Sequence, residues 1–263
     1  KGPGHTFNLL MKLTILGSGT HIPVKNRSNP AYLLDINGET ILLDCGSGTL
    51  RQIAKAGRSE WEIDKIFLSH LHIDHIMDFV PLFFTFKYQK DKQATKKVVP
   101  VFAHSEFENY FKKIEAMYGP WINAETRQYE LVKLLPNQNL QYGFKIETFN
   151  AEHSENSLIF RFTDRNDHTF VYTGDTSPSE NLIRATYRAD LLLIECSGRD
   201  DLKIKGHLAP KDVKIILSAA KVKTAVITHI HPLNDNLELH SKLTTPGTNV
   251  IIAEDLAIID VKE

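Results

Sequence analysis

The sequence is poor in the features that mark secreted, membrane-spanning and polyanion-coating proteins. It has two cysteines in 263 residues, Cys45 and Cys196, which excludes a disulfide-stapled scaffold. No apolar run is long enough to cross a bilayer, so we expect no membrane partner. Neither sign of charge dominates, since the formal net charge is −1, and the whole-molecule field will not gather nucleic acid. A nucleic acid would have to be held by local features.

What the chain does have is enough length and apolar content for a core. At 263 residues and 42% hydrophobic, it can bury about three quarters of its extended surface. No Pro/Gly/Ser-rich linker or repeat divides it, so we expect a single domain over residues 11–263. Residues 1–10 read as a cloning remnant before a native Met11. Without a secretory pattern, we expect a cytoplasmic protein with buried, reduced thiols, compatible with a homodimer.

Short β-rich runs alternate with helical patterns along the chain. Strands are predicted at 12–16, 31–36, 40–43, 65–69, 98–102, 145–149, 157–163, 168–173, 190–195, 223–228, 249–253 and 256–261. Helices are predicted at 49–56, 75–86, 105–118, 179–188 and 210–221. Early strands follow one another and later ones alternate with helices, which favours layered α/β sheets with helices outside over a βαβ barrel. The basic segment 87–97 reads as a solvated loop, with a substrate-phosphate contact as the alternative.

The residues that carry chemistry begin with HLHIDH at 70–75, directly after a predicted strand. Side chains alternate along an extended segment, so His70 and His72 point the same way. If the chain then turns into a helix, Asp74 and His75 face the same cavity. Three imidazoles and a carboxylate are costly to bury without a partner. A divalent metal supplies that partner, and neutral histidine with carboxylate is a typical zinc ligand set.

Polar residues also follow other apolar strands of the prediction. His153, Asp175 and His229 each stand at such a strand end. A lone strand-end histidine is more often a hydrogen-bonded structural residue, but with the first cluster these make seven candidate ligands. Seven is enough for two metals that share one carboxylate. His231 has the same parity as His229, and we prefer His229 because it is nearer the strand end.

Five motifs, spread from about Met11 to the C-terminus, share a recognisable order. They are Gly17-Ser18-Gly19-Thr20 with Pro23 and Arg27, Leu43-Asp44-Cys45-Gly46-Ser47-Gly48, HLHIDH, Tyr172-Thr173-Gly174-Asp175, and Gly206-His207-Leu208-Ala209-Pro210 ahead of Thr228-His229. This pattern resembles the metallo-β-lactamase superfamily, specifically its ribonuclease Z-like phosphodiesterase branch. The resemblance implies a four-layer αββα sandwich with the metals at one edge, between the sheets.

The resemblance also implies the ligand set. It assigns three ligands to each ion and one bridging carboxylate: His70, His72 and His153 for the first ion, Asp74, His75 and His229 for the second, and Asp175 between them. Asp44 would orient a ligand histidine by fixing its tautomer and ring angle. Zinc is the default for both divalent ions, with manganese or iron as alternatives because such donor sets select metals poorly.

Two cations a few ångströms apart lower the pKa of a bridging water, so the resemblance implies attack by a metal-bridging hydroxide. Asp74 is expected to serve catalysis as well as metal binding. His207, in a Gly-His segment before a predicted helix, is the candidate that protonates the leaving alkoxide; a helix-capping or surface histidine is the alternative.

The sequence departs from the tRNA-maturing members of the branch in two places. Those enzymes carry a long arm between the third histidine ligand and the bridging aspartate, but the interval from His153 to Asp175 holds only two strands and a turn. Their Ser-Arg-Tyr-like segment is replaced by Ile230-His231-Pro232-Leu233. We therefore expect a phosphodiesterase for small or flexible phosphodiesters, such as a cyclic nucleotide, a cyclic sugar phosphate or a short oligonucleotide. The alternatives are a thioester, lactone or lactam hydrolase, a tRNA 3′-processing endonuclease, and a regulatory binding module without turnover.

Overall fold

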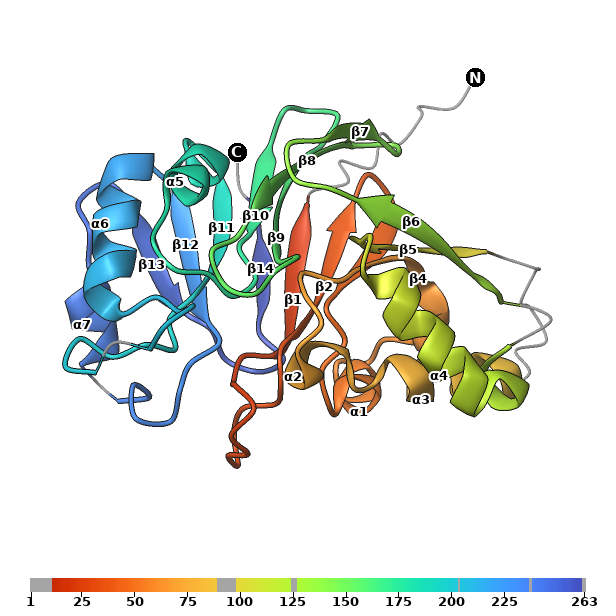
Figure 1. Ribbon diagram of the computed structural model, residues 1–263. Helices are drawn as coiled ribbons and strands as arrows, with labels where there is room; N and C mark the ends of the chain where they lie inside the picture. Colours follow the sequence, from red (N-terminus) through yellow and green to blue (C-terminus); the bar gives the residue numbers. More distant parts are fainter. Residues whose placement is uncertain (1–10, 89–97, 124–126, 203, 237, 262–263) are drawn as a thin grey trace, which may run out of the picture.

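Two seven-stranded sheets lie face to face, and helices cover the outer side of each (Figure 1). The computed structural model describes residues 11–88, 98–123, 127–202, 204–236 and 238–261. The predicted remnant at 1–10 and most of the predicted basic loop at 87–97 lie outside these ranges. Within them, no helix is both long and apolar enough to cross a membrane.

Strands from both ends of the chain take part in the two sheets. In spatial order, the first sheet contains β14 (Ile258–Asp260), β1 (Lys12–Gly17), β2 (Ala31–Ile36), β3 (Glu39–Leu43), β4 (Ile63–Phe67), β5 (Val99–His104) and β6 (Tyr129–Leu134). The second contains β13 (Asn249–Ile252), β12 (Thr224–Thr228), β11 (Leu191–Glu195), β10 (Thr169–Tyr172), β9 (Leu158–Thr163), β8 (Lys145–Asn150) and β7 (Asn139–Gln141). Both sheets are mixed, with β3 to β6 parallel in the first and β10 to β13 parallel in the second.

The helices divide between the two outer faces. The first sheet is covered by α1 (Thr49–Lys55), α2 (Ile73–Ile76), α3 (Phe79–Tyr88) and α4 (Phe107–Ile122), with the short 3-10 helix η1 (Glu60–Glu62) beside them. The second is covered by α5 (Glu180–Thr186), α6 (Pro210–Ala220) and α7 (Leu239–Leu243). Four layers result, as predicted.

Alternation of side chains along the strands builds this arrangement. In β11, Leu191 and Leu193 enter the apolar layer between the sheets, whereas Leu192 and Ile194 pack under the helices of the second sheet. A strand that is buried on both faces reads as a continuous apolar run, which is why the sequence LLLIE signals a central strand. Three separate apolar layers therefore hold the sandwich together.

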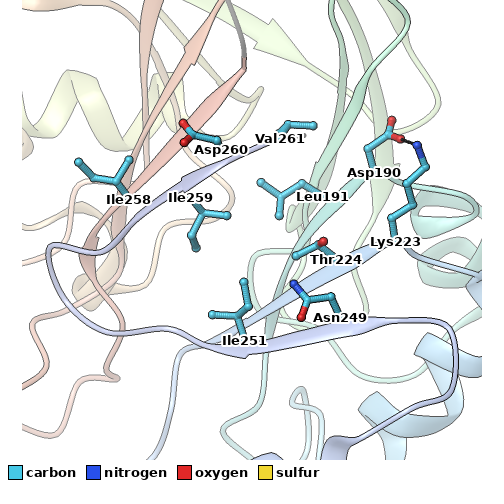
Figure 2. A pocket seen from close by; sticks show the side chains of 10 residues that line it. All are labelled: Asp190, Leu191, Lys223, Thr224, Asn249, Ile251, Ile258, Ile259, Asp260 and Val261. Carbon is cyan, nitrogen blue, oxygen red and sulfur yellow. Dashed lines mark ion pairs between the residues drawn. The ribbon is translucent and has the colours of Figure 1, made fainter. Parts of the chain in front are cut away.

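The parallel strands determine where polar residues gather. Asp44 follows β3, Asp175 follows β10 and His229 follows β12, and parallel neighbours end at the same edge of a sheet. The opposite edge holds a cavity of about 460 Å³ between β13 and β14 (Figure 2). It is lined by apolar side chains and by the ion pair of Lys223 with Asp190, whose atoms are 2.7 Å apart. None of the predicted site residues lines it.

The prediction of one helix over 75–86 is wrong. The chain forms α2 and α3 instead, because the backbone N–H of Asp78 donates to Cys45 O at 2.9 Å and draws the chain toward the loop after β3. Strands β6 and β7, helix α7 and η1 were not predicted. The β6 sequence YELVKL does alternate, but its exposed and half-buried positions weaken the apolar signal.

Candidate metal centre

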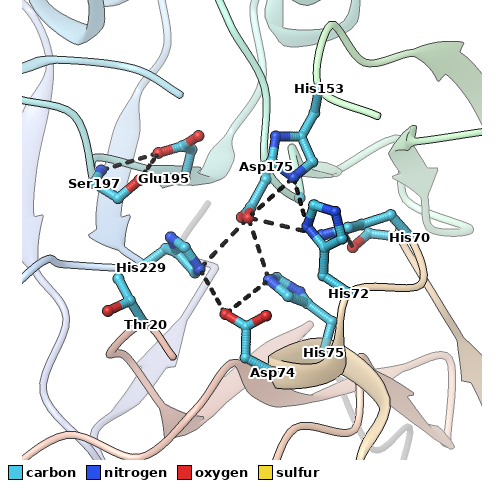
Figure 3. A network of polar contacts seen from close by, with 12 residues as sticks. Thr20, His70, His72, Asp74, His75, His153, Asp175, Glu195, Ser197 and His229 are labelled. Atoms are coloured by element: carbon cyan, nitrogen blue, oxygen red, sulfur yellow. Dashed lines mark hydrogen bonds and ion pairs between the residues drawn. The ribbon is translucent and has the colours of Figure 1, made fainter. Parts of the chain in front are cut away.

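Three imidazoles from two parts of the chain converge with the carboxylate of a third part at the sheet edge where the parallel strands end (Figure 3). His70 and His72 come from the loop after β4, His153 from the loop after β8, and Asp175 from the end of β10. One potential ligand atom from each lies within 4.8 Å of the others. His153 Nε2 and His72 Nδ1 face each other at 2.9 Å. The structure thus brings together the four residues expected around the first ion.

A second group lies beside the first. Asp74 and His75 stand on α2, and His229 follows β12, with one ligand atom of each within 4.8 Å of the others. His229 adopts a left-handed backbone with φ of 50°, an uncommon conformation for a side chain other than glycine or asparagine. This turn brings His229 Nε2 to 3.5 Å from Asp74 Oδ2.

Asp175 connects the two groups through one oxygen. Its Oδ2 lies 3.7 Å from Nε2 of both His70 and His153, 3.4 Å from His75 Nε2 and 3.5 Å from His229 Nε2. Gly174 makes this position accessible, because its φ is +54° and a Cβ would come within 2.7 Å of the Ser69 side chain. The carboxylate is placed as a bridging ligand would be.

The donor atoms fit metal ions better than they fit one another. Several buried atoms have no hydrogen-bond partner within the described residues: His70 Nε2, His75 Nε2, Asp175 Oδ1 and both ring nitrogens of His229. Orphaned buried donors and acceptors cost stability unless something satisfies them. Neutral imidazole nitrogens and carboxylate oxygens aimed at common points form a site for divalent ions such as zinc.

Asp44 supports this centre through hydrogen bonds and has no exposed surface. Its carboxylate accepts hydrogen bonds from the backbone N–H and hydroxyl of Ser69, both at 2.7 Å, and from the hydroxyl of Tyr172. It also lies 2.7 Å from His75 Nδ1, which fixes that nitrogen as the donor and turns Nε2 toward Asp175. The predicted role of Asp44 in orienting a ligand histidine agrees with this geometry.

Burial and neighbouring carboxylates shift the pKa values of the ring nitrogens in opposite directions. Burial lowers the pKa of His70 well below its ordinary value, which favours the neutral, ligand-competent imidazole. Burial would lower the pKa of His75 as well, but the carboxylates of Asp175 and Asp44 outweigh burial and raise it. A divalent cation held by these residues would balance the buried carboxylates of Asp175 and Asp44.

His207 lies at the rim of the centre, in the loop before α6. Its Nδ1 is 2.9 Å from Glu195 Oε1 and 3.9 Å from Asp175 Oδ2. Burial lowers the pKa of His207, but the hydrogen bond and charge of Glu195 outweigh burial and raise it to about 9. His207 is therefore not a surface histidine, one of the alternatives for this residue, since its side chain is only 17% exposed.

Glu195 is the functional candidate that the sequence analysis missed. It is 1% exposed at the end of β11, and its carboxylate also accepts the backbone N–H groups of Thr176 and Ser197. The sequence did contain a signal for Glu195. It is a polar residue at the end of an apolar strand, as Asp175 and His229 are polar residues just after apolar strands. His231, the alternative to His229, accepts the N–H of Leu233 on Nδ1 and belongs to neither ligand group.

Comparison with known proteins agrees with this architecture. The family described as Anti-Pycsar protein Apyc1 matches residues 11–229. The metallo-beta-lactamase fold protein YhfI from Bacillus subtilis superposes with a TM-score of 0.84 at 26% identity, over 95% of this chain and 99% of that chain. Ribonuclease Z of Methanosarcina acetivorans is 26% identical over 323 aligned positions, 96% of this chain and 98% of the enzyme. The short form of human tRNase Z shares the fold, with a TM-score of 0.78 at 22% identity, over 96% and 100% of the two chains.

Proposed function

This chain belongs to the family described as Anti-Pycsar protein Apyc1 and has the ribonuclease Z-like metallo-β-lactamase fold, and we propose that it is a metal-dependent phosphodiesterase acting on small or flexible phosphodiesters. The observation that carries the proposal is Asp175 Oδ2, which lies within 3.7 Å of a ring nitrogen of four histidines from both ligand groups. Two ions that share this carboxylate fit the donor set. Zinc is our proposal for both, with manganese or iron as alternatives.

The residues around such ions have different roles: most bind metal, one orients a ligand, and one also serves catalysis. Bound divalent ions lower the pKa of a water and neutralise charge on phosphate oxygens. The six further candidate ligands would hold the ions in place, and Asp44 keeps the ring of His75 turned toward Asp175. Asp74, in the first turn of α2, is the proposed ligand that we also assign to catalysis.

His207 holds the proton that the leaving oxygen needs. Glu195 accepts a hydrogen bond from Nδ1, so the second ring nitrogen is the one that can deliver a proton. An alkoxide is a poor leaving group and gains most from this transfer. The pair therefore accelerates the cleavage of alkyl phosphodiesters more than it accelerates the cleavage of esters with activated leaving groups.

The size of the substrate follows from what lies between His153 and Asp175. That interval contains only β9, β10 and their connections, and no arm. The alignment with the Methanosarcina acetivorans ribonuclease Z spans 323 positions, more than the 263 residues of this chain, so that enzyme has residues with no counterpart in this sequence. Small phosphodiesters, cyclic nucleotides among them, suit the armless site better than precursor tRNA.

A substrate panel tests the reaction class. Metal-replete protein should hydrolyse bis(p-nitrophenyl) phosphate and a cyclic nucleotide, and should leave a thioester, a lactone and a β-lactam intact. Turnover of a thioester or lactam without any phosphodiester would replace our proposal with the second hydrolase class. Metal-loaded protein that turns over none of them would favour a binding module.

We propose further that the protein is a homodimer in the cytoplasm, where its free Cys45 and Cys196 would stay reduced. Adjacent helices α2, α3 and α4 expose seven large apolar side chains: Ile73, Met77, Phe84, Tyr88, Met117, Tyr118 and Trp121. Each is 37–65% exposed, and exposed apolar side chains gathered on neighbouring helices are typical of a surface that another chain covers. The opposite face of α3 is buried in the core, so this helix carries apolar residues on both its buried and its exposed face.

The oligomer is tested by light scattering after size-exclusion chromatography. Phe84→Glu should convert a dimer of about 60 kDa, twice the chain mass of 29.9 kDa, into monomers. Ile215→Glu is the matched control, because Ile215 is 65% exposed on α6, away from the patch. A wild-type monomer at micromolar concentration would contradict the homodimer and leave the phosphodiesterase proposal standing.

A further inference from the structure

His229 differs from the other buried candidate ligands in what holds its ring. Three of those have a protein partner at Nδ1, at 2.7–3.0 Å: Ser69 for His70, Asp44 for His75 and Gly206 for His153. His229 is 3% exposed, and neither of its ring nitrogens has a hydrogen-bond partner among the described residues. Its ring nevertheless faces Asp74 and Asp175 (Figure 3). The direction of this ring must therefore come from the backbone that carries it.

The backbone at His229 is anchored on both sides. Thr228 O accepts the N–H of Cys196 at 2.9 Å, and Ile230 N donates to Ser18 O at 2.9 Å. Between these contacts His229 takes its left-handed conformation, with φ of 50°. Such a conformation persists in a residue other than glycine only where the surrounding structure fixes its neighbours. The carbonyl of Ser18 is the contact that directs the chain after β12.

Ser18, which is fully buried, is held in turn by Asp255. The backbone N–H and the hydroxyl of Ser18 donate to Asp255 Oδ1 at 2.9 and 2.8 Å. The second oxygen of that carboxylate, Oδ2, accepts from Ser28 N at 2.7 Å and from Gln52 Nε2 at 2.9 Å. Hydrogen bonds to an ionised carboxylate are stronger than those between neutral groups. One side chain from the loop between β13 and β14 thus fixes the turn after β1, to which the His229 backbone is bonded.

Arg27 connects Ser18 to two further segments around His229. Its Nη1 donates to Ser18 Oγ at 2.7 Å and to Ala253 O at 2.5 Å. Its Nε and Nη2 donate to the two carboxylate oxygens of Asp235, each at 2.8 Å, in the loop that follows His229. A guanidinium can make these contacts at once because its donors form a planar fork, which a lysine lacks. Ser18 and Arg27 belong to one of the five sequence motifs, and the proposed catalysis gives them no role.

From these contacts we infer that Asp255 is a positioning residue for the second ion. Together with Ser18 and Arg27 it holds the backbone turn of His229, and the turn aims the ring in place of a hydrogen bond to Nδ1. The second ion, which takes His229 as a ligand, depends on this support, whereas the first ion does not. The inference rests on the metal centre of the proposed function and extends it to residues outside the seven expected ligands.

The test compares two proteins that each keep one group of ligands complete. His153→Ala leaves the second group intact, and His229→Ala leaves the first. Asp255→Asn, added to each, keeps the side-chain size but turns an amide nitrogen toward donors that the carboxylate accepts. Zinc affinity, measured by competition with a chromophoric chelator, should fall about ten- to a hundredfold in the His153→Ala protein. It should change less than about twofold in the His229→Ala protein, where the turn has no ligand to position.

A milder variant decides the question if Asp255→Asn does not fold. Ser18→Ala retains the carbonyl bonded to Ile230 and loses only the hydroxyl, so it should lower the zinc affinity of the His153→Ala protein about two- to tenfold. Asp190→Asn is the matched control, because the Asp190 carboxylate also accepts a backbone N–H and a hydroxyl, both of Thr169, but at the opposite edge of the sheet. It should change the zinc affinity of neither protein.

The pattern of losses decides about the inference. Equal losses in the His153→Ala and His229→Ala proteins, or no loss in either, would overturn it, as would wild-type protein that binds no zinc. Wild-type protein that binds two zinc ions but cleaves no phosphodiester would contradict the proposed function alone. The affinity comparison would then still decide whether Asp255 positions His229.

Discussion

Glu195 Oε1 lies 2.9 Å from His207 Nδ1, and it is this contact that aims the His207 ring at the rim of the metal centre. The glutamate comes from the end of β11, while the histidine comes from the loop before α6. Glu195 is itself held by the backbone N–H groups of Thr176 and Ser197, so the acceptor that orients the His207 ring has a fixed position.

This pairing predicts how the role of His207 depends on the leaving group. His207→Ala should slow cleavage of an alkyl phosphodiester by roughly a hundred- to ten-thousandfold, the usual range for a lost general acid. It should affect bis(p-nitrophenyl) phosphate far less, because p-nitrophenolate leaves without a proton. Steady-state kinetics on both substrates check this, together with metal content, which should stay at the wild-type value. Equal large losses would assign His207 to phosphate or metal binding instead.

The bridging position of Asp175 predicts that both ions depend on it. Protein purified without chelator should contain close to two transition-metal ions per chain by elemental analysis. Asp175→Ala should lose most of this metal and most of the activity. Protein that holds no metal and gains no thermal stability from added zinc or manganese would contradict the metal centre.

Removal of Asp44 should loosen the metals without removing a ligand. Asp44→Asn cannot accept from Ser69, Tyr172 and His75 at once, so the His75 ring loses its orientation. Metal affinity, measured by competition with a chromophoric chelator, should fall about ten- to a hundredfold. Asp78→Asn, on the neighbouring break between α2 and α3, is the control for a general disturbance of this region. An unchanged metal affinity would mean that Asp44 supports only the fold.

Away from the centre, Asp35 predicts a pH-dependent part of the folding free energy. Burial raises the pKa of Asp35, but hydrogen bonds from Arg58 and Thr40 outweigh burial and hold the pKa below its ordinary value of 3.8. The folded state therefore binds this proton less readily than the unfolded chain. The stabilisation is present above pH 3.8 and is lost as pH falls through the lower, folded-state pKa.

Denaturant titration of wild type and Asp35→Asn across this range measures the effect. The variant should be about 1 kcal/mol less stable at pH 7, and the difference should shrink toward pH 3. Glu130→Gln, at an exposed position of β6, should show no such trend. A difference that stays constant with pH would mean that the charge of Asp35 does not contribute.

The armless interval between His153 and Asp175 predicts poor processing of precursor tRNA. The protein should cleave a cyclic nucleotide at least a hundredfold more efficiently than it trims the 3′ end of a precursor tRNA at physiological salt. Gel analysis of cleavage position and rate measures this. Efficient trimming at a single position would restore the tRNA-processing alternative.

Much of the fold and of the candidate site could be read from local patterns. Strict alternation and apolar runs predict the central strands. Burial of one face of a strand requires an apolar residue at every second position, and burial of both faces requires a continuous apolar run. HLHIDH predicts a convergent group because six consecutive residues cannot move far apart. The structure brings all seven expected ligands together, and their binding of metal stays a prediction for elemental analysis.

Other features have no local signature. The break between α2 and α3 depends on Cys45 O, a partner more than thirty positions away in the chain. The placement of His229, but not His231, beside Asp74 and His75 depends on a left-handed turn that the local sequence does not reveal, and the choice of His229 as ligand stays a prediction.

The sequence by itself indicated the expected ligand residues, layered sheets with helices outside and the absence of an arm, because these predictions rest on residue identity, periodicity and interval length; the four-layer sandwich came from the family resemblance. Only the tertiary structure decided that Glu195 pairs with His207 and that Ser18, bonded to Asp255, anchors the backbone after His229. The register of the parallel strands sets Glu195 beside Thr228, and with it the neighbourhood of His229 and His207. Such register is settled by packing over the whole of both sheets, so contacts between residues far apart in the chain appear only once the sandwich has formed.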